Sequence, residues 1–127
     1  MALFPKANIL VAEDFEPWRS KVREILQVRP EWTIVSEARD GPEAVQKAIA
    51  LQPDIILLDL GLPILNGIDA AKIIRQKCPQ SRIIFLTTNE DREIMNEALC
   101  VGGARYILKS NATTELLNAI SAALHDC

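Results

Sequence analysis

Acidic and basic side chains stand directly after short apolar runs of this sequence. Glu13 and Asp14 follow Ile-Leu-Val-Ala, Asp59 follows Ile-Ile-Leu-Leu, and Lys109 follows Tyr-Ile-Leu. Carboxylates gathered in one place repel each other, by about 4 kcal/mol per pair at ~4 Å and an effective dielectric constant near 20. If these residues meet, a cation must offset the repulsion, and Lys109 supplies one positive charge.

A divalent hard cation would supply more charge than one lysine. Mg²⁺ binds a few carboxylates, keeps several water molecules and shares phosphate oxygens. An aspartate beside Mg²⁺ and Lys109, with the Thr87 hydroxyl in reach, could accept a phosphoryl group. Alternatively, Glu13 and Asp14 form a solvated turn that caps the next helix, and Lys109 is a solvated strand end. The elements that hold these residues decide between the two interpretations.

Five short runs rich in Ile, Val and Leu have the length of β-strands. Three of them, near Leu10, Ile56 and Ile84, are almost continuously hydrophobic, which is typical of parallel strands covered on both faces. Segments with apolar residues at helical spacing lie between the runs. The predicted strands cover residues 8–12, 33–38, 54–59, 82–87 and 104–109.

This alternation predicts an α/β fold, a doubly wound (βα)5 parallel sheet of five strands with right-handed crossovers and the common order 2-1-3-4-5. In that order the ends of the first and third strands face the crevice. Pro17 fits the first turn of the first helix, Asn66-Gly67 opens the third helix, and Gly102-Gly103 closes the fourth. Because no linker divides the chain, residues 1–127 are expected to form a single domain.

Composition argues against several other functions. The net charge is −3 and the basic residues are scattered, so this domain alone is a poor candidate for binding nucleic acid or a membrane. The one histidine, His125, excludes a multi-histidine metal site. Cys78, Cys100 and Cys127 are widely spaced, which fits a reducing compartment. No apolar run approaches the ~18 residues of a membrane span, so we expect a cytoplasmic protein.

Several segments, in their order and spacing, resemble the receiver domains of two-component response regulators over nearly the whole chain. The resemblance implies a flavodoxin-like three-layer fold. Residues 32–41 and 98–109 further resemble receivers of the NarL/FixJ type, which carry a C-terminal helix-turn-helix. The segments that match are Ile-Leu-Val-Ala-Glu-Asp at 9–14, Pro-Asp-Ile-Ile-Leu-Leu-Asp-Leu-Gly-Leu-Pro at 53–63, Asn66-Gly67, Phe-Leu-Thr-Thr at 85–88 and Gly-Ala-Arg-Tyr-Ile-Leu-Lys-Ser at 103–110.

The resemblance implies that Asp59 is the phosphoacceptor and that a sensor histidine kinase donates the phosphoryl group from a phosphohistidine. Glu13, Asp14 and Asp59, with the backbone carbonyl of Gly61, would hold Mg²⁺. Lys109 would contact a phosphoryl oxygen. The chain would then be a regulatory phosphoacceptor and not an enzyme in its own right.

The resemblance also implies a switch. Thr87 would move to the phosphoryl group and Tyr106 would turn with it, changing the face formed by the fourth helix, fifth strand and fifth helix. Homodimer formation on phosphorylation is one expected result. Gly61, Thr88 and Asn89 would tune the lifetime of the phosphorylated state; Thr88 is bulkier than usual there, and the Asn89 amide is no general base.

The output stays open at this stage. Transcriptional control through a C-terminal DNA-binding domain absent from this chain is favoured, and the alternative is a stand-alone receiver that acts as a relay or by protein contact. An aspartyl phosphatase would resemble D-x-D-G-[TV] after the first strand, where Glu13-Asp14-Phe15 stands. A flavin-binding domain would need a phosphate loop there that is rich in Ser, Thr and Gly. Neither G-x-G-x-x-G nor G-x-x-x-x-G-K-[ST] is present, so nucleotide binding is not indicated.

Overall fold

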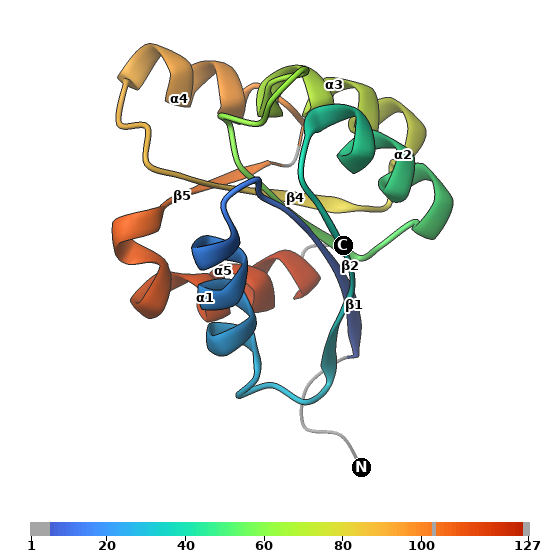
Figure 1. Ribbon diagram of the computed structural model, residues 1–127, viewed down its shortest axis with the longest axis vertical. Coiled ribbons are helices and arrows are strands. Elements are labelled where there is room, and N and C mark those ends of the chain that lie inside the picture. Colours follow the sequence, from blue (N-terminus) through green and yellow to red (C-terminus); the bar gives the residue numbers. More distant parts are fainter. Residues whose placement is uncertain (1–5, 103, 126–127) are drawn as a thin grey trace.

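The computed structural model describes residues 6–102 and 104–125. Within them, parallel strands alternate with α-helices along the chain (Figure 1). The strands are β1 Ala7–Ala12, β2 Trp32–Ala38, β3 Ile55–Leu58, β4 Arg82–Thr87 and β5 Arg105–Leu108. The helices are α1 Glu16–Leu26, α2 Gly41–Leu51, α3 Gly67–Lys77, α4 Arg92–Leu99 and α5 Ala112–His125, with a short 3₁₀ helix, η1, at Lys109–Asn111.

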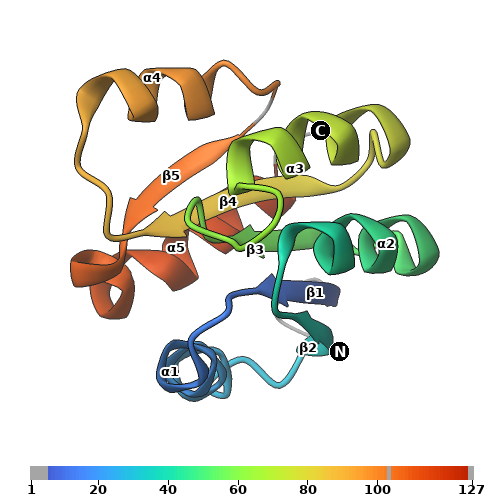
Figure 2. The same ribbon diagram turned by 45° about the horizontal axis from the view of Figure 1, so that its top comes forward.

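The five strands form one parallel sheet in the order β2-β1-β3-β4-β5, as predicted. Helices α1 and α5 cover one face, and α2, α3 and α4 cover the other (Figures 1 and 2). Each face of the sheet has its own hydrophobic core, and alternate residues of a strand point into one or the other. Ile9 and Val11 pack with α1 and α5, and Leu10 packs with α2 and α3. The central strands are apolar on both faces because each face carries a helical layer.

Side chains cap the starts of α2, α3 and α4. The Asn66 side chain accepts a hydrogen bond from Asp69 N at 3.0 Å and so caps α3, as its sequence position predicts. Helix α1 is capped differently. Its N-cap residue is Phe15, which provides no side-chain hydrogen bond. The alternative in which Asp14 caps α1 is therefore wrong, because the helix begins one residue too late for it.

Several predicted element ends differ from the structure. Asp59 and Lys109 lie just past β3 and β5 and outside the strand ladders. Helix α4 ends at Leu99, with Cys100 as its C-cap, so it stops before Gly102. Gly103 and Cys127 lie outside the described residues. The described peptide bonds are all trans, including Lys109–Ser110.

Gly67 lets the start of α3 approach the end of β3. A Cβ atom at Gly67 would lie 2.2 Å from the backbone oxygen of Asp59, so a larger residue does not fit here. The Gly67 N–H also donates to the Leu60 carbonyl at 2.9 Å. The backbone that carries Asp59 is therefore held against α3.

In the described part of the chain, no helix is both long and apolar enough to cross a membrane.

Candidate functional site

The sheet brings three carboxylates together at the carboxyl ends of its strands. One oxygen from each of Glu13, Asp14 and Asp59 lies within 4.8 Å of the other two. The pairing of β1 with β3 places Ala12 beside Leu58, and the Asp59 N–H donates to the Ala12 carbonyl at 3.0 Å. Residues that follow these two strands are therefore neighbours, as expected at a topological switch point.

The three carboxylates differ in exposure. Glu13 is only 4% exposed, the Asp59 side chain is 12% exposed, and Asp14 is open to solvent. Glu13 Oε2 accepts a hydrogen bond from the Phe15 N–H at 3.1 Å. A solvated turn is therefore the wrong description of Glu13, which is buried between the sheet and α1.

Lys109 is buried beside the acidic cluster and is not a solvated strand end. Its ammonium donates to Glu13 Oε1 and lies 3.9 Å from Asp59 Oδ1. The ring of Trp18 stands 5.1 Å from the same nitrogen, close enough for a cation–π contact. Lys109 thus joins two of the three carboxylates, and its aromatic neighbour shields it from water.

Burial sets the electrostatics of the site. Loss of solvation raises the pKa of Asp59, and the nearby charge of Asp14 raises it further. The Lys109 ammonium and hydrogen bonds from the Gly61 N–H and Thr87 hydroxyl oppose that rise in pKa. Burial likewise raises the pKa of Glu13, with the Lys109 hydrogen bond opposing it. Both carboxylates therefore favour additional positive charge.

A cleft of about 400 Å³ opens beside Asp59, between the end of the sheet and helices α3 and α4. Gly61, Thr87, Thr88 and Asn89 line it together with Asp59. A Cβ atom built on Gly61 would lie 3.6 Å from Asp59 Oδ2, so the glycine stands directly against the carboxylate. Thr87 is buried and Thr88 is exposed. The cleft gives a small anion access to the Asp59 carboxylate.

Hydrogen bonds connect Asp59 with the face formed by α4, β5 and α5. Thr87 Oγ1 accepts from the Asn89 N–H at 3.2 Å, and the Tyr106 hydroxyl donates to the Asn89 carbonyl. The Asn89 side chain accepts from the Asp91 N–H at 2.8 Å, so its amide oxygen is engaged at the start of α4. The Tyr106 ring packs near Phe85, with 6.4 Å between ring centroids.

Sequence reasoning missed two residues of α1 that border the site, Trp18 and Arg19. Trp18 fits the apolar spacing of the first helix and gives no sign of a role at the site, yet its ring faces Lys109. Arg19 is 5% exposed and donates to the Glu13 carbonyl at 2.8 Å. Its spacing was a usable signal: Arg19 stands three residues before Val22 on the buried stripe, where a charge needs a partner.

The donor set fits Mg²⁺. The three clustered carboxylates, of which Asp59 lines the open cleft, are hard oxygen ligands, and the exposure of Asp14 leaves room for the water molecules that this ion retains. The fold and the site together define a class: a doubly wound α/β domain with an aspartate, a lysine and a hydroxyl around an acidic cation site.

Comparison with known proteins identifies the family. Residues 9–121 match the model of the response regulator receiver domain, and the chain belongs to this family. The chain is 34% identical over 113 residues to the transcriptional regulatory protein LnrK of Bacillus subtilis, covering 89% of this chain and 51% of LnrK. It is 39% identical over 111 residues to a protein-glutamate methylesterase/protein-glutamine glutaminase of Thermotoga maritima, covering 86% of this chain and 32% of that protein.

A solved structure agrees with these sequence relatives. The signal receiver domain of the Mycobacterium tuberculosis response regulator NarL superposes with a TM-score of 0.89 at 27% identity, covering 97% of this chain and 99% of that one. The resemblance to receivers of the NarL type is thereby confirmed. The chain spans about half the length of LnrK and about a third of the methylesterase.

Proposed function

We propose that Asp59 accepts a phosphoryl group from a phosphohistidine of a sensor kinase. The observation that carries the proposal is the placement of Asp59 in an open cleft, with the Lys109 ammonium 3.9 Å away and two further carboxylates beside it. A carboxylate among other carboxylates and a buried cation is poised for a reaction that brings in phosphate charge and a metal ion.

The reaction replaces one bond to phosphorus with another. An Asp59 oxygen forms a bond to phosphorus as the bond between phosphorus and the imidazole nitrogen breaks, and the electron pair of that bond stays on the imidazole. Lys109 offsets negative charge on the phosphoryl oxygens. Glu13, Asp14, Asp59 and the Gly61 carbonyl would hold Mg²⁺, which would supply further positive charge there.

The signal leaves the site through Thr87. Its hydroxyl, which hydrogen bonds to Asp59, would bond to the phosphoryl group instead, and the link through Asn89 would carry that change to Tyr106. The result is a shift between two packings of the face formed by α4, β5 and α5. Thr88, Asn89 and Gly61 border the path of an attacking water and would set the phosphate lifetime.

We assign the chain, residues 1–127, to a single receiver domain whose output is transcription. The support is the similarity to LnrK, a transcriptional regulatory protein, and to receivers of the NarL type. DNA binding would belong to a separate domain, and dimer formation through the α4-β5-α5 face would couple the two. The methylesterase relative makes an enzymatic output the competing assignment, and a relay role without an output domain is the other.

Phosphorylation of purified variants tests the proposal. The wild-type chain, Asp59→Asn and Asp69→Asn are incubated with Mg²⁺ and either phosphoramidate or a histidine-phosphorylated kinase domain, and phosphoryl incorporation is followed by intact mass spectrometry. Asp69 is an exposed aspartate on α3, so its substitution is the matched control. Wild type and Asp69→Asn should gain one phosphoryl group each, labile to both acid and base as an acyl phosphate is, and Asp59→Asn none. Equal incorporation in Asp59→Asn would move the acceptor elsewhere.

A further inference from the structure

We propose that Arg19 is a positioning residue that holds the Glu13–Asp14 loop in the geometry needed to bind Mg²⁺. The inference rests on the proposed function, because it concerns the same acidic cluster. Arg19 lies on α1, is not among the residues that line the cleft, and contacts the backbone of the loop instead.

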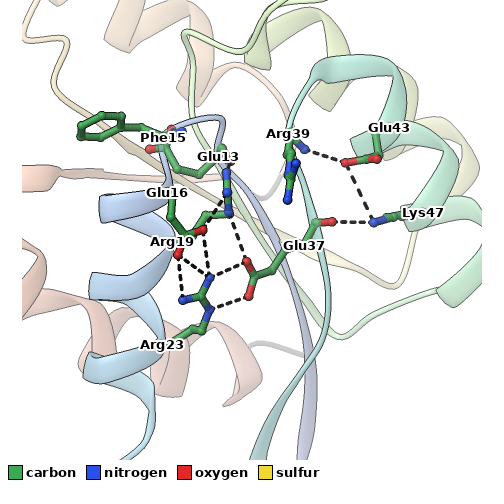
Figure 3. Close-up of polar contacts among 9 residues, drawn as sticks. All are labelled: Glu13, Phe15, Glu16, Arg19, Arg23, Glu37, Arg39, Glu43 and Lys47. Carbon is green, nitrogen blue, oxygen red and sulfur yellow. Dashed lines mark hydrogen bonds and ion pairs between the residues drawn. The ribbon is translucent and has the colours of Figure 1, made fainter.

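The Arg19 guanidinium contacts three separate parts of the fold (Figure 3). One terminal nitrogen donates to the Glu13 carbonyl at 2.8 Å, and the other donates to Glu16 Oε2 at 2.7 Å. The Nε atom lies 3.3 Å from Glu37 Oε1 on β2. These three partners fix the position and orientation of the buried guanidinium. The Glu13 carbonyl, which accepts a hydrogen bond from it, is therefore fixed in direction too.

The contact with the Glu13 carbonyl has a direct consequence for the metal site. That carbonyl belongs to the peptide group that links Glu13 to Asp14. Fixing its direction fixes the orientation of the peptide plane and hence the positions of the Asp14 N and Cα atoms, from which its side chain extends. Phe15, the N-cap residue of α1, provides no side-chain cap, so the Arg19 hydrogen bond and the hydrogen bond from the Phe15 N–H to Glu13 Oε2 restrain the loop instead.

Arg23 steadies the partners of Arg19 without touching the loop. It donates to Glu37 Oε2 at 2.8 Å and to Glu16 Oε1 at 3.0 Å, so the two arginines alternate with two carboxylates (Figure 3). Arg23 is more exposed: its side chain is 41% accessible, against 6% for Arg19. Removing Arg23 therefore disturbs the same ion-pair cluster but leaves the hydrogen bond to the Glu13 carbonyl in place.

Lysine cannot replace Arg19 in this role. The planar guanidinium offers donors in fixed directions and reaches three acceptors at once, whereas a lysine ammonium is a compact charge on a flexible stem. Arg19→Lys keeps the positive charge and most of the aliphatic stem. It tests the directional hydrogen bond separately from the charge.

The experiment measures Mg²⁺ binding to folded protein and not phosphorylation. Mg²⁺ alone is titrated into wild type, Arg19→Lys, Arg19→Met and the control Arg23→Met, and the Kd is taken from the amide shifts of Asp14 and Gly61 in ¹H–¹⁵N spectra. Thermal unfolding with EDTA gives the stability of each variant without metal. Arg19→Lys and Arg19→Met should raise the Kd for Mg²⁺ by about tenfold, which is typical when a residue that orients a metal ligand is replaced. Arg23→Met should stay within about twofold of wild type.

Loss of stability alone does not produce this pattern. If Arg19 serves only to hold α1 on the sheet, both Arg19 and Arg23 variants lower the Tm and bind Mg²⁺ with the wild-type Kd, and the inference is overturned. If Arg19→Met does not fold, Arg19→Lys decides. A wild-type chain that binds no Mg²⁺ would refute the metal site of the proposed function; wild-type binding with unchanged Arg19 variants would refute only the role of Arg19.

Discussion

At the scale of single residues, burial of the ionised carboxylates at the site destabilises the folded protein. Asp59 lies mostly out of solvent, and the charge of Asp14 acts against its ionisation. Glu13 is buried as well. The buried Lys109 ammonium donates directly to Glu13 and stands farther from Asp59. Activity and stability therefore compete at Asp59.

We predict that Asp59→Asn stabilises the metal-free protein at pH 7 by about 1 kcal/mol, which corresponds to roughly 4 °C in Tm. The folded-state pKa of Asp59 is raised above its unfolded value, so the folded state binds more protons between these two values. The wild type therefore loses stability as the pH rises through that interval, and regains it as the pH falls.

The measurement is urea unfolding with EDTA from neutral to acidic pH, with Asp69→Asn as the control. The advantage of Asp59→Asn over wild type should shrink as the pH falls toward the raised pKa of Asp59. An Asp59→Asn protein that is less stable than wild type at pH 7, or an advantage that grows in acid, would contradict the assignment of Asp59 as an electrostatically strained group.

At the scale of elements, the link from Thr87 through Asn89 to Tyr106 joins the end of β4, the start of α4 and β5. Together, these hydrogen bonds connect the cleft with the face formed by α4, β5 and α5. Because Tyr106 already donates to the Asn89 carbonyl, a displacement of the β4–α4 loop must change the environment of its ring.

We predict that beryllofluoride, a phosphoryl mimic, shifts the NMR signals of α4, β5 and α5 in the presence of Mg²⁺. A tenfold change in the population of the two packings needs only ~1.4 kcal/mol, within the range of one charge-assisted hydrogen bond. Thr87→Ala removes the hydroxyl and should confine the shifts to the cleft. Shifts of equal extent in wild type and Thr87→Ala would show that Thr87 does not carry the signal.

At the scale of the whole molecule, the acidic cluster joins loops that follow two neighbouring strands, so an ion bound there ties β1 to β3. We predict that Mg²⁺ raises the unfolding free energy by about 2.7 kcal/mol at a concentration of 100 times its Kd, because the unfolded chain lacks the site. Differential scanning calorimetry with Mg²⁺ or EDTA measures this.

Asp14→Asn should remove most of that stabilisation by Mg²⁺, since it takes away an exposed carboxylate of the cluster. Asp69→Asn, which changes an exposed carboxylate outside the cluster, should keep the full effect of the ion. If Asp14→Asn gains as much stability from Mg²⁺ as wild type, the ion binds elsewhere.

The sequence by itself determined the strands, their order and the convergence of Glu13, Asp14 and Asp59. These features follow from local pattern: runs such as Ile55–Leu58 are apolar because both faces of a central strand are covered, and the crossover rule leaves few ways to arrange five such units. Polar residues at the carboxyl ends then meet by topology alone.

Only the tertiary structure decided how the charges pair. Lys109 donates to Glu13, 96 positions earlier in the chain, while Trp18 covers its ammonium and Arg19 reaches back to the Glu13 carbonyl. Such contacts depend on the distance and tilt between α1, β1 and β5, which the packing of both cores sets. Periodicity reports which face of an element is buried. It does not report which buried side chain meets which partner, because that choice is made between elements that are distant in sequence.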